Sequence, residues 1–435
     1  MRFAALTLLT CAFGTAASAA EHPKPLMKDF IGLNGHTVQF KPELYGPVCK
    51  VVRDYHPVEW DLGKETDVPT TFPFARNRVD WSQVYGSWKK AGYHINASLM
   101  FESIEQKVWK DVPRDAKAYG LAFAKAFGPS STKLVDAAEV GNEPGKWSDA
   151  DYRTMFEAMA TGLRAGDPKL TIVTCAADAE KSGDYMKAMS CVQGLEHLYD
   201  VINVHSYAQT ENWPTWRRSF PEDPKLLDYT SRIEKLIAWR DANAKGKPIW
   251  VTEFGYDAST KPAPKTGDFK GWVDVTDDQQ GQWLVRSFLV FARMSVDKAY
   301  IYFFNDSDEP MFHGSSGITR NWQPKPAFHA VAHLNKSLGE FRFAKTITNK
   351  AGELQVDEYV NGSDAKQHLW VTWLASGADK TQEVTLSKLP GKVTKAERTP
   401  LAAGDDAAKA AFTAKGGDVT LTVGESPTYL WIQAP

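Results

Sequence analysis

Short apolar or β-branched runs alternate with longer amphipathic segments along most of this chain. Eight such runs recur, each short enough to form one strand: 30–34, 50–55, 93–101, 135–141, 171–176, 201–206, 248–254 and 299–304. The clearest helices between them are 116–127, 149–165, 225–243 and 277–296, in which apolar residues recur three and four positions apart. This alternation predicts parallel strand-helix-strand units.

The number of these units predicts an α/β fold, the (β/α)8 barrel. An open doubly wound sheet is disfavoured, because no glycine-rich phosphate-binding turn follows the first run. In a closed barrel the functional side chains stand at the carboxyl ends of the strands. A polar residue at a strand end is therefore a candidate site residue, whereas one at a strand start is expected to be structural.

The pattern changes after residue 339 to short alternating strands separated by Gly, Asp and Lys turns. These strands span 353–359, 367–374, 382–386, 418–423 and 428–432, with one further candidate helix at 405–412. We interpret 340–435 as a smaller all-β sandwich that follows a barrel domain at 21–339.

The first twenty residues have the pattern of a cleaved secretory signal peptide. Arg2 precedes the apolar run 3–13, and small residues fill positions 16–20. We therefore expect a secreted or periplasmic protein. No later stretch contains about eighteen uninterrupted apolar residues, so no membrane contact is expected once the signal is removed.

Charge and cysteine content limit the expected binding partners and disulfides. The net charge of -2 offers no general attraction for a phosphate backbone, which excludes nucleic acid as an expected partner. Signal removal leaves three cysteines, and an odd number permits one disulfide at most. Either Cys175 pairs with Cys191, or Cys49, Cys175 and Cys191 are all buried thiols. The oligomeric state is left open.

Two glutamates close predicted strands and are the candidate catalytic pair. Glu143 follows the fourth strand, and Glu253 lies near the end of the seventh. Cleavage of a glycosidic bond needs two facing carboxyl groups, one to protonate the departing oxygen and one to attack the anomeric carbon. If Glu253 is ionised nearby, charging Glu143 is disfavoured, so we expect Glu143 to hold the proton.

At these positions the chain resembles glycoside hydrolase clan A, and its layout is nearest to the xylosidase/iduronidase-like families that carry a C-terminal β-sandwich. Gly141-Asn142-Glu143-Pro144 is similar to the acid/base motif of the clan, and Thr252-Glu253-Phe254-Gly255 is similar to its nucleophile segment. The resemblance implies a retaining mechanism with Glu143 as acid/base and Glu253 as nucleophile.

Further positions match the clan in kind. The resemblance implies that Arg53 keeps the nucleophile ionised, that Tyr207 hydrogen-bonds the nucleophile, that His205 contacts the sugar and that Asn142 bonds its 2-hydroxyl. The chain departs from the clan in two places. Met100-Phe101-Glu102 replaces the usual histidine that closes strand three, and Phe303-Phe304-Asn305-Asp306 replaces the strand-eight tryptophan.

These departures and the remaining loop residues define the other candidates. Glu102 either binds a sugar hydroxyl or is structural, Phe304 and Asp306 border the cleft, and Trp147 stacks on a sugar face. A metal held by Asp306, Asp308 and Glu309 is the disfavoured alternative, since calcium loops space their ligands more regularly. No metal or cofactor is expected, because the motifs that bind them are missing from the sequence.

The expected activity is double-displacement cleavage of O-glycosidic bonds in an extracellular or envelope poly- or oligosaccharide. Two alternatives share these residues: a catalytically silent carbohydrate-binding barrel, and a transglycosylase that uses the same two glutamates. The sugar, its linkage and endo or exo action are left open.

Overall fold

Eight parallel strands close into a barrel in the computed structural model, which describes residues 23–350, 352–404 and 408–435. The barrel strands, in chain order, are β1 (Ile31–Gly35), β2 (Val51–Pro57), β3 (His94–Met100), β4 (Ala137–Val140), β5 (Thr171–Asp178), β7 (Val201–His205), β8 (Ile249–Phe254) and β9 (Lys298–Ile301). Pairing of β1 with both β2 and β9 closes the ring. The predicted (β/α)8 barrel is confirmed, whereas the predicted signal at 1–20 lies outside the described residues.

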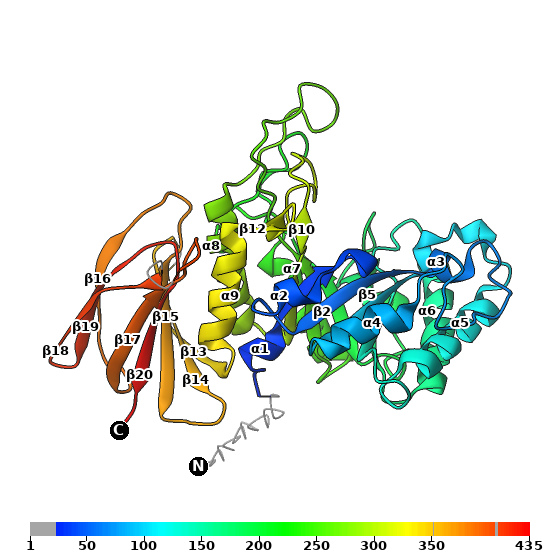
Figure 1. Ribbon diagram of the computed structural model, residues 1–435, viewed down its shortest axis with the longest axis horizontal. Coiled ribbons are helices and arrows are strands. Elements are labelled where there is room, and N and C mark those ends of the chain that lie inside the picture. Colours follow the sequence, from blue (N-terminus) through cyan, green and yellow to red (C-terminus); the bar gives the residue numbers. More distant parts are fainter. Residues whose placement is uncertain (1–22, 351, 405–407) are drawn as a thin grey trace, which may run out of the picture.

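Amphipathic helices surround the barrel (Figure 1). They are α1 (Met27–Phe30), α2 (Pro42–Tyr45), α3 (Val58–Leu62), α4 (Trp81–Lys90), α5 (Val112–Phe127), α6 (Asp149–Gly166), α7 (Thr230–Asn243), α8 (Asp277–Arg293) and α9 (Pro326–Leu338). Side-chain caps fix where several begin: the Ser148 hydroxyl accepts from the backbone of Asp151 at the start of α6, and Thr276 and Gln279 form a reciprocal capping box on α8. Short pairings add β6 (Lys187–Ala188), β10 (Asn305–Asp306), β11 (Thr319–Arg320) and β12 (Gln323–Pro324).

The interior of the barrel changes from apolar to charged along the strands. A separate buried cluster fills it near the strand starts, formed by Val51, Ala137, Val173, Val201, Trp250 and Tyr300. Two residues further along β2 and β4, on the same face of each strand, Arg53 and Glu139 form a fully buried ion pair with Nη2 and Oε1 2.6 Å apart. The carboxyl ends of the strands therefore rest on a rigid charged layer.

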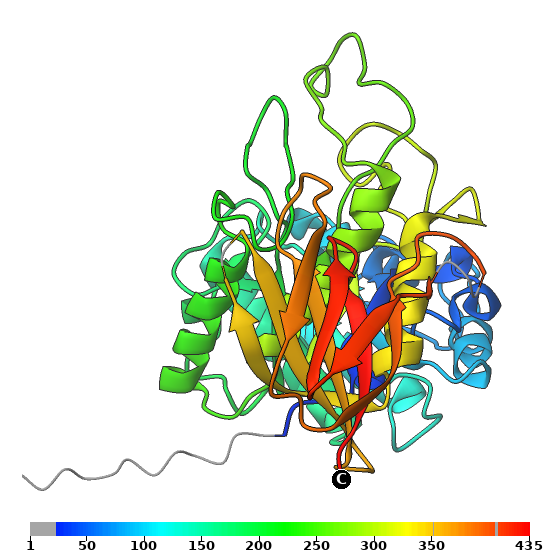
Figure 2. The ribbon, with the colours of Figure 1, turned by 90° about the vertical axis from the view of Figure 1, so that its left-hand side faces the viewer.

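Two antiparallel sheets follow the barrel (Figure 2). One contains β13 (Phe341–Asn349), β14 (Leu354–Asn361), β15 (Gln367–Leu374), β17 (Lys392–Arg398) and β20 (Thr428–Gln433), and the other contains β16 (Gln382–Leu386), β18 (Phe412–Lys415) and β19 (Asp418–Val423). The sandwich is confirmed, and β13, β17 and β18 are strands that the sequence pattern missed. In the expected helix 405–412, residues 405–407 lie outside the described part and Phe412 begins a strand. The proposed domain boundary at 339/340 stays a prediction.

The sandwich packs on the side of the barrel formed by α8 and α9 (Figure 1). One continuous hydrophobic cluster contains barrel residues together with Trp373 of β15. Arg293 of α8 donates to Asp357 of β14 at 2.8 Å, and Trp373 donates to Glu222 at 2.6 Å. The two parts thus share both apolar and ionic contacts.

The helices and the cysteines of the described residues test two of the expectations from the sequence. None of the helices in these ranges is both long and apolar enough to cross a membrane. Cys49, Cys175 and Cys191 are all buried free thiols, so the Cys175–Cys191 disulfide alternative is wrong.

Candidate active site

Glu143 and Glu253 meet at the carboxyl ends of their strands. A carboxylate oxygen from each and a ring nitrogen of His205 all lie within 4.8 Å of one another. The pairing of β7 with β8 places His205 directly beside Glu253. Glu253 is buried, whereas the side chain of Glu143 keeps 28% of its surface exposed. The structure therefore places the two predicted glutamates close together, with Glu143 on the solvent side.

Three donors surround the Glu253 carboxylate. Tyr55 donates to Oε1 at 2.6 Å, Tyr207 donates to Oε2 at 2.8 Å, and Arg53 donates to Oε1 at 3.2 Å. Burial raises the pKa of Glu253, but the charges of His205 and Arg53 and the hydrogen bond from Tyr55 have the larger effect. The net result is a pKa lowered to about 2. Glu253 is therefore ionised at neutral pH. The predicted contacts of Arg53 and Tyr207 with this residue are present.

His205 bridges the two carboxyl groups. Its Nδ1 lies 2.8 Å from Oε1 of Glu143 and 3.5 Å from Oε2 of Glu253. Burial lowers the pKa of His205, but the charge of Glu253 and the hydrogen bond with Glu143 raise it above its usual value. The ring therefore lies between the two glutamates, and the expected contact of His205 with sugar stays a prediction.

Arg53 links Glu253 to the turn that carries Glu143. Its guanidinium binds Glu139 through two nitrogens, with Nε 2.8 Å from Oε2. Its Nη2 also donates to Oδ1 of Asn142 at 2.8 Å, and its Nη1 donates to Oδ1 of Asn34 at 3.0 Å. A planar fork suits several acceptors at once. The side-chain oxygen of Asn142 therefore points toward Arg53, and the side-chain nitrogen of Asn142 points away from it.

Three predicted cleft residues are instead part of the protein core, which corrects their assignment. Trp147 is only 4% exposed and packs edge to face on Phe101 at 5.0 Å. Phe304 is buried against Trp322, with ring centroids 5.6 Å apart. Asp306 is buried 3.2 Å from the Lys325 ammonium. In each case the side chain packs against other residues of the protein, so a position after a strand end did not give exposure.

Glu102 lies beside the acid/base turn, as expected from its place after β3. Its Oε1 accepts hydrogen bonds from the backbone N–H groups of Asn142 at 2.6 Å and Glu143 at 3.0 Å. Of the two roles expected for Glu102, these contacts support the structural one.

Several site residues were missed from the sequence. Tyr55 contacts Glu253, His36 stacks on Tyr55 with ring centroids 4.8 Å apart, and the ring centroids of His313 and Tyr302 are 4.5 Å apart. Burial and the nearby charge of Arg218 lower the pKa of His313 to about 3, so its ring is neutral. Tyr55 had a usable signal, because it follows Arg53 by two positions and shares its face of the strand. The histidines come from loops, where no periodicity applies.

Metal binding has two candidate locations among the described residues. The first is the Glu143, His205 and Glu253 cluster, but the Arg53 guanidinium already lies 3.2 Å from Glu253 and opposes a cation there. The second is the acidic loop after β9, whose three carboxylates are each paired with a basic side chain. These pairs are Asp306 with Lys325, Asp308 with Arg320 and Glu309 with Lys261. Both arrangements fit ion pairing better than metal ligation.

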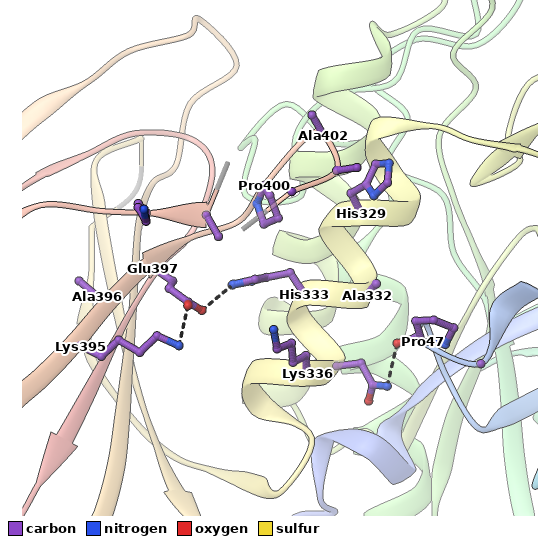
Figure 3. Close-up of a pocket in the computed structure, with 16 residues that line it drawn as sticks. Pro47, His329, Ala332, His333, Lys336, Lys395, Ala396, Glu397, Pro400 and Ala402 are labelled. Atoms are coloured by element: carbon purple, nitrogen blue, oxygen red, sulfur yellow. Dashed lines mark hydrogen bonds and ion pairs between the residues drawn. The ribbon is translucent and has the colours of Figure 1, made fainter. Parts of the chain in front are cut away.

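A cavity of about 720 Å³ lies away from the glutamates, between α9 and the strand β17 (Figure 3). His333 on α9 faces Glu397 on β17 across it, with Nε2 and Oε2 3.0 Å apart. The pair joins the sandwich to the barrel, so we assign the lining of this cavity to the interface between them.

The comparison with protein families gives one match. Residues 92–288 match the model of the family described as Cellulase (glycosyl hydrolase family 5). This segment contains both Glu143 and Glu253. A search of curated protein sequences gives no match.

Similar solved structures share the whole architecture. A family 39 glycoside hydrolase from Bacteroides cellulosilyticus WH2 has a TM-score of 0.70 at 17% identity, and the alignment covers 94% of this chain and 83% of that one. A glucosidase from Croceicoccus marinus has a TM-score of 0.62 at 13% identity, over 96% and 98% of the two chains. A family 30 subfamily 8 xylanase from Clostridium acetobutylicum has a TM-score of 0.59 at 11% identity, over 93% and 96%. Identities this low establish the shared fold.

Proposed function

We propose that the chain is an O-glycosyl hydrolase of glycoside hydrolase clan A, which cleaves the glycosidic bonds of its substrate with retention of the anomeric configuration. The family-model match over residues 92–288, which contain both glutamates, supports this assignment, and the closed barrel shared with the similar structures agrees with it. The retaining route and the roles of individual residues are the content of the proposal.

The spacing of the two carboxylates supports retention. Inverting enzymes need about 6.5–9.5 Å between their carboxyl groups to admit a water molecule, whereas retaining enzymes need about 5–5.5 Å. Oxygens of Glu143 and Glu253 approach within 4.8 Å, which agrees with the shorter spacing. This distance is the single observation that carries the proposal.

The proposed reaction has two displacements. In the first, an ionised oxygen of Glu253 bonds to the anomeric carbon while the glycosidic bond breaks and Glu143 gives its proton to the departing oxygen. In the second, Glu143 takes a proton from water as the water oxygen attacks the same carbon and the ester to Glu253 breaks. The low pKa of Glu253 suits the first step, since the attacking group must be charged. His205 keeps both carboxyl groups aimed at one sugar.

We further propose a poly- or oligosaccharide substrate outside the cytoplasm. The location rests on the signal-like pattern of the first twenty residues. Similar structures include a glucosidase, xylanases and an α-L-arabinofuranosidase, so the sugar itself differs among them.

The first experiment compares the wild type with Glu253→Ala on aryl glycosides and on plant, fungal and bacterial polysaccharides. We expect the variant to lose at least about 10³-fold in kcat, because the nucleophile is lost, while keeping its unfolding temperature. The anomeric proton of the first product, followed by NMR, should show the configuration of the substrate. A first product of inverted configuration would overturn the retaining route. Sustained turnover by Glu253→Ala would overturn the assignment of the nucleophile.

A further inference from the structure

Glu102 stands beside the turn that carries Glu143. The strands β3 and β4 are neighbours in the barrel and pair as far as Leu99 and Val140. Just beyond these residues the chain forms the short 3-10 helix Phe101–Ser103, whose first residue is fully buried. The backbone that carries Glu102 is therefore anchored in the core next to the acid/base turn.

A single oxygen of Glu102 holds two consecutive backbone groups. Its Oε1 accepts from the N–H of Asn142 at 2.6 Å and from the N–H of Glu143 at 3.0 Å. Fixing two successive peptide groups on one acceptor restricts the rotation of the backbone between them, and hence the direction of the Glu143 side chain. The second oxygen, Oε2, is buried and has no hydrogen-bond partner among the described residues. Glu102 is thus turned toward the peptide backbone of the turn.

The surroundings of Glu102 allow either protonation state to fulfil this role. Burial and the charge of Glu139 raise the pKa of Glu102 and the backbone N–H groups of Asn142 and Glu143 lower it, with a net value of about 7. The charge of Glu102 also acts on the buried thiol of Cys175. A neutral carboxyl still offers one carbonyl oxygen as an acceptor. A glutamine at this position should therefore keep the contact, whereas an alanine removes it.

We propose that Glu102 is a positioning residue, which aims the Glu143 carboxyl at the departing oxygen by holding the backbone of Asn142 and Glu143. The inference rests on the proposed function of Glu143 as the acid/base. It develops the structural one of the two roles expected for Glu102, and it predicts a defect confined to the steps in which Glu143 transfers a proton.

The test uses leaving groups of different basicity on the sugar that the wild type cleaves best. A dinitrophenolate departs without a proton, whereas an unsubstituted phenolate needs one from Glu143. For Glu102→Ala we expect kcat/KM to fall about 30-fold on the phenyl glycoside and less than about threefold on the dinitrophenyl glycoside. The loss of about 30-fold is smaller than the 10²–10⁴-fold that a general acid contributes, because Glu143 is misplaced and not removed. Glu102→Gln should stay within about threefold of the wild type on both.

Two controls separate the possible failures. Glu105→Gln removes the charge of an exposed carboxylate in the same loop, and it should leave kcat/KM unchanged on both glycosides. Glu143→Ala must itself lose more kcat/KM on the phenyl glycoside than on the dinitrophenyl glycoside. If it does not, the proposed function fails, whatever the result for the Glu102 variants. If Glu143→Ala shows it while Glu102→Ala loses equally on both substrates, or on neither, the positioning role is overturned. Should Glu102→Ala not fold, Glu102→Asp, which draws the acceptor back by one methylene, is judged by the same comparison.

Discussion

At the scale of single residues, the site is organised to keep one carboxylate charged. Glu253 is buried, which would favour its neutral form, yet every polar neighbour that contacts it stabilises the ionised form. The Arg53 charge is itself shared with Glu139, so it is fixed in place before any ligand arrives. Glu253 is therefore already ionised before any substrate binds.

This arrangement predicts a pH effect of the Tyr55 hydroxyl. Tyr55 donates to ionised Glu253, so Tyr55→Phe should raise the pKa of Glu253, and activity should be lost at a higher pH as the solution is acidified. A hydrogen bond to a charged group contributes about 1.5–3 kcal/mol, which corresponds to about 1–2 pKa units. The acid limb of kcat/KM, which reports the free enzyme, should move upward by that amount.

The matched control for Tyr55→Phe is Tyr185→Phe, because Tyr185 is 63% exposed. Its profile should overlay that of the wild type. An unmoved acid limb in Tyr55→Phe would show that the 2.6 Å contact does not set the ionisation of the nucleophile.

At the scale of elements, the end of β4 depends on one glycine. Gly141 has φ of +85°, and a Cβ built there would lie 2.6 Å from Cε1 of the buried Phe101. Gly141→Ala should therefore cost about 1 kcal/mol for the left-handed backbone and more for the clash, which must shift the turn that carries Glu143. We expect lower stability in urea unfolding, together with a loss of activity that is larger on phenyl than on dinitrophenyl glycosides.

Gly92 supplies the control for this variant. It has the same φ of +85°, but nothing lies within 4 Å of a Cβ built there. Gly92→Ala should therefore lose only the backbone part of the stability and keep full activity. Equal behaviour of the two variants would mean that the contact with Phe101 does not position the turn.

The elements also show how far the sequence could predict this molecule. The eight barrel strands were found because buried runs bounded by helical periodicity are local signals, and both glutamates were found because they end such runs. Trp147, Phe304 and Asp306 were misplaced because loop paths after a strand depend on tertiary packing. His36 and His313 were missed for the same reason. The sandwich strands β13 and β18 were missed because both are largely exposed and lack the buried alternation that marks a strand.

At the scale of the whole molecule, the contacts between the barrel and the sandwich predict that the two parts unfold as one unit. Trp373 of β15 is completely buried in the cluster that also contains barrel residues, and its indole donates to Glu222 in the loop after β7. Arg293 of α8 stacks over the same ring at 4.8 Å and pairs with Asp357 of β14. Neither part can unfold without exposing this surface, so their stabilities are coupled.

Trp373→Ala tests this coupling. A buried aromatic replaced by alanine typically costs about 3–5 kcal/mol, and here Glu222 also loses a donor. Calorimetry should show one transition in the wild type, and one transition at a lower temperature in the variant, because the loss is felt by the whole unit. Trp213→Ala, at a site that is 62% exposed, should leave the transition in place. Two resolved transitions in either protein, with the sandwich melting apart from the barrel, would contradict the single folding unit, since the shared cluster would then contribute too little to join them.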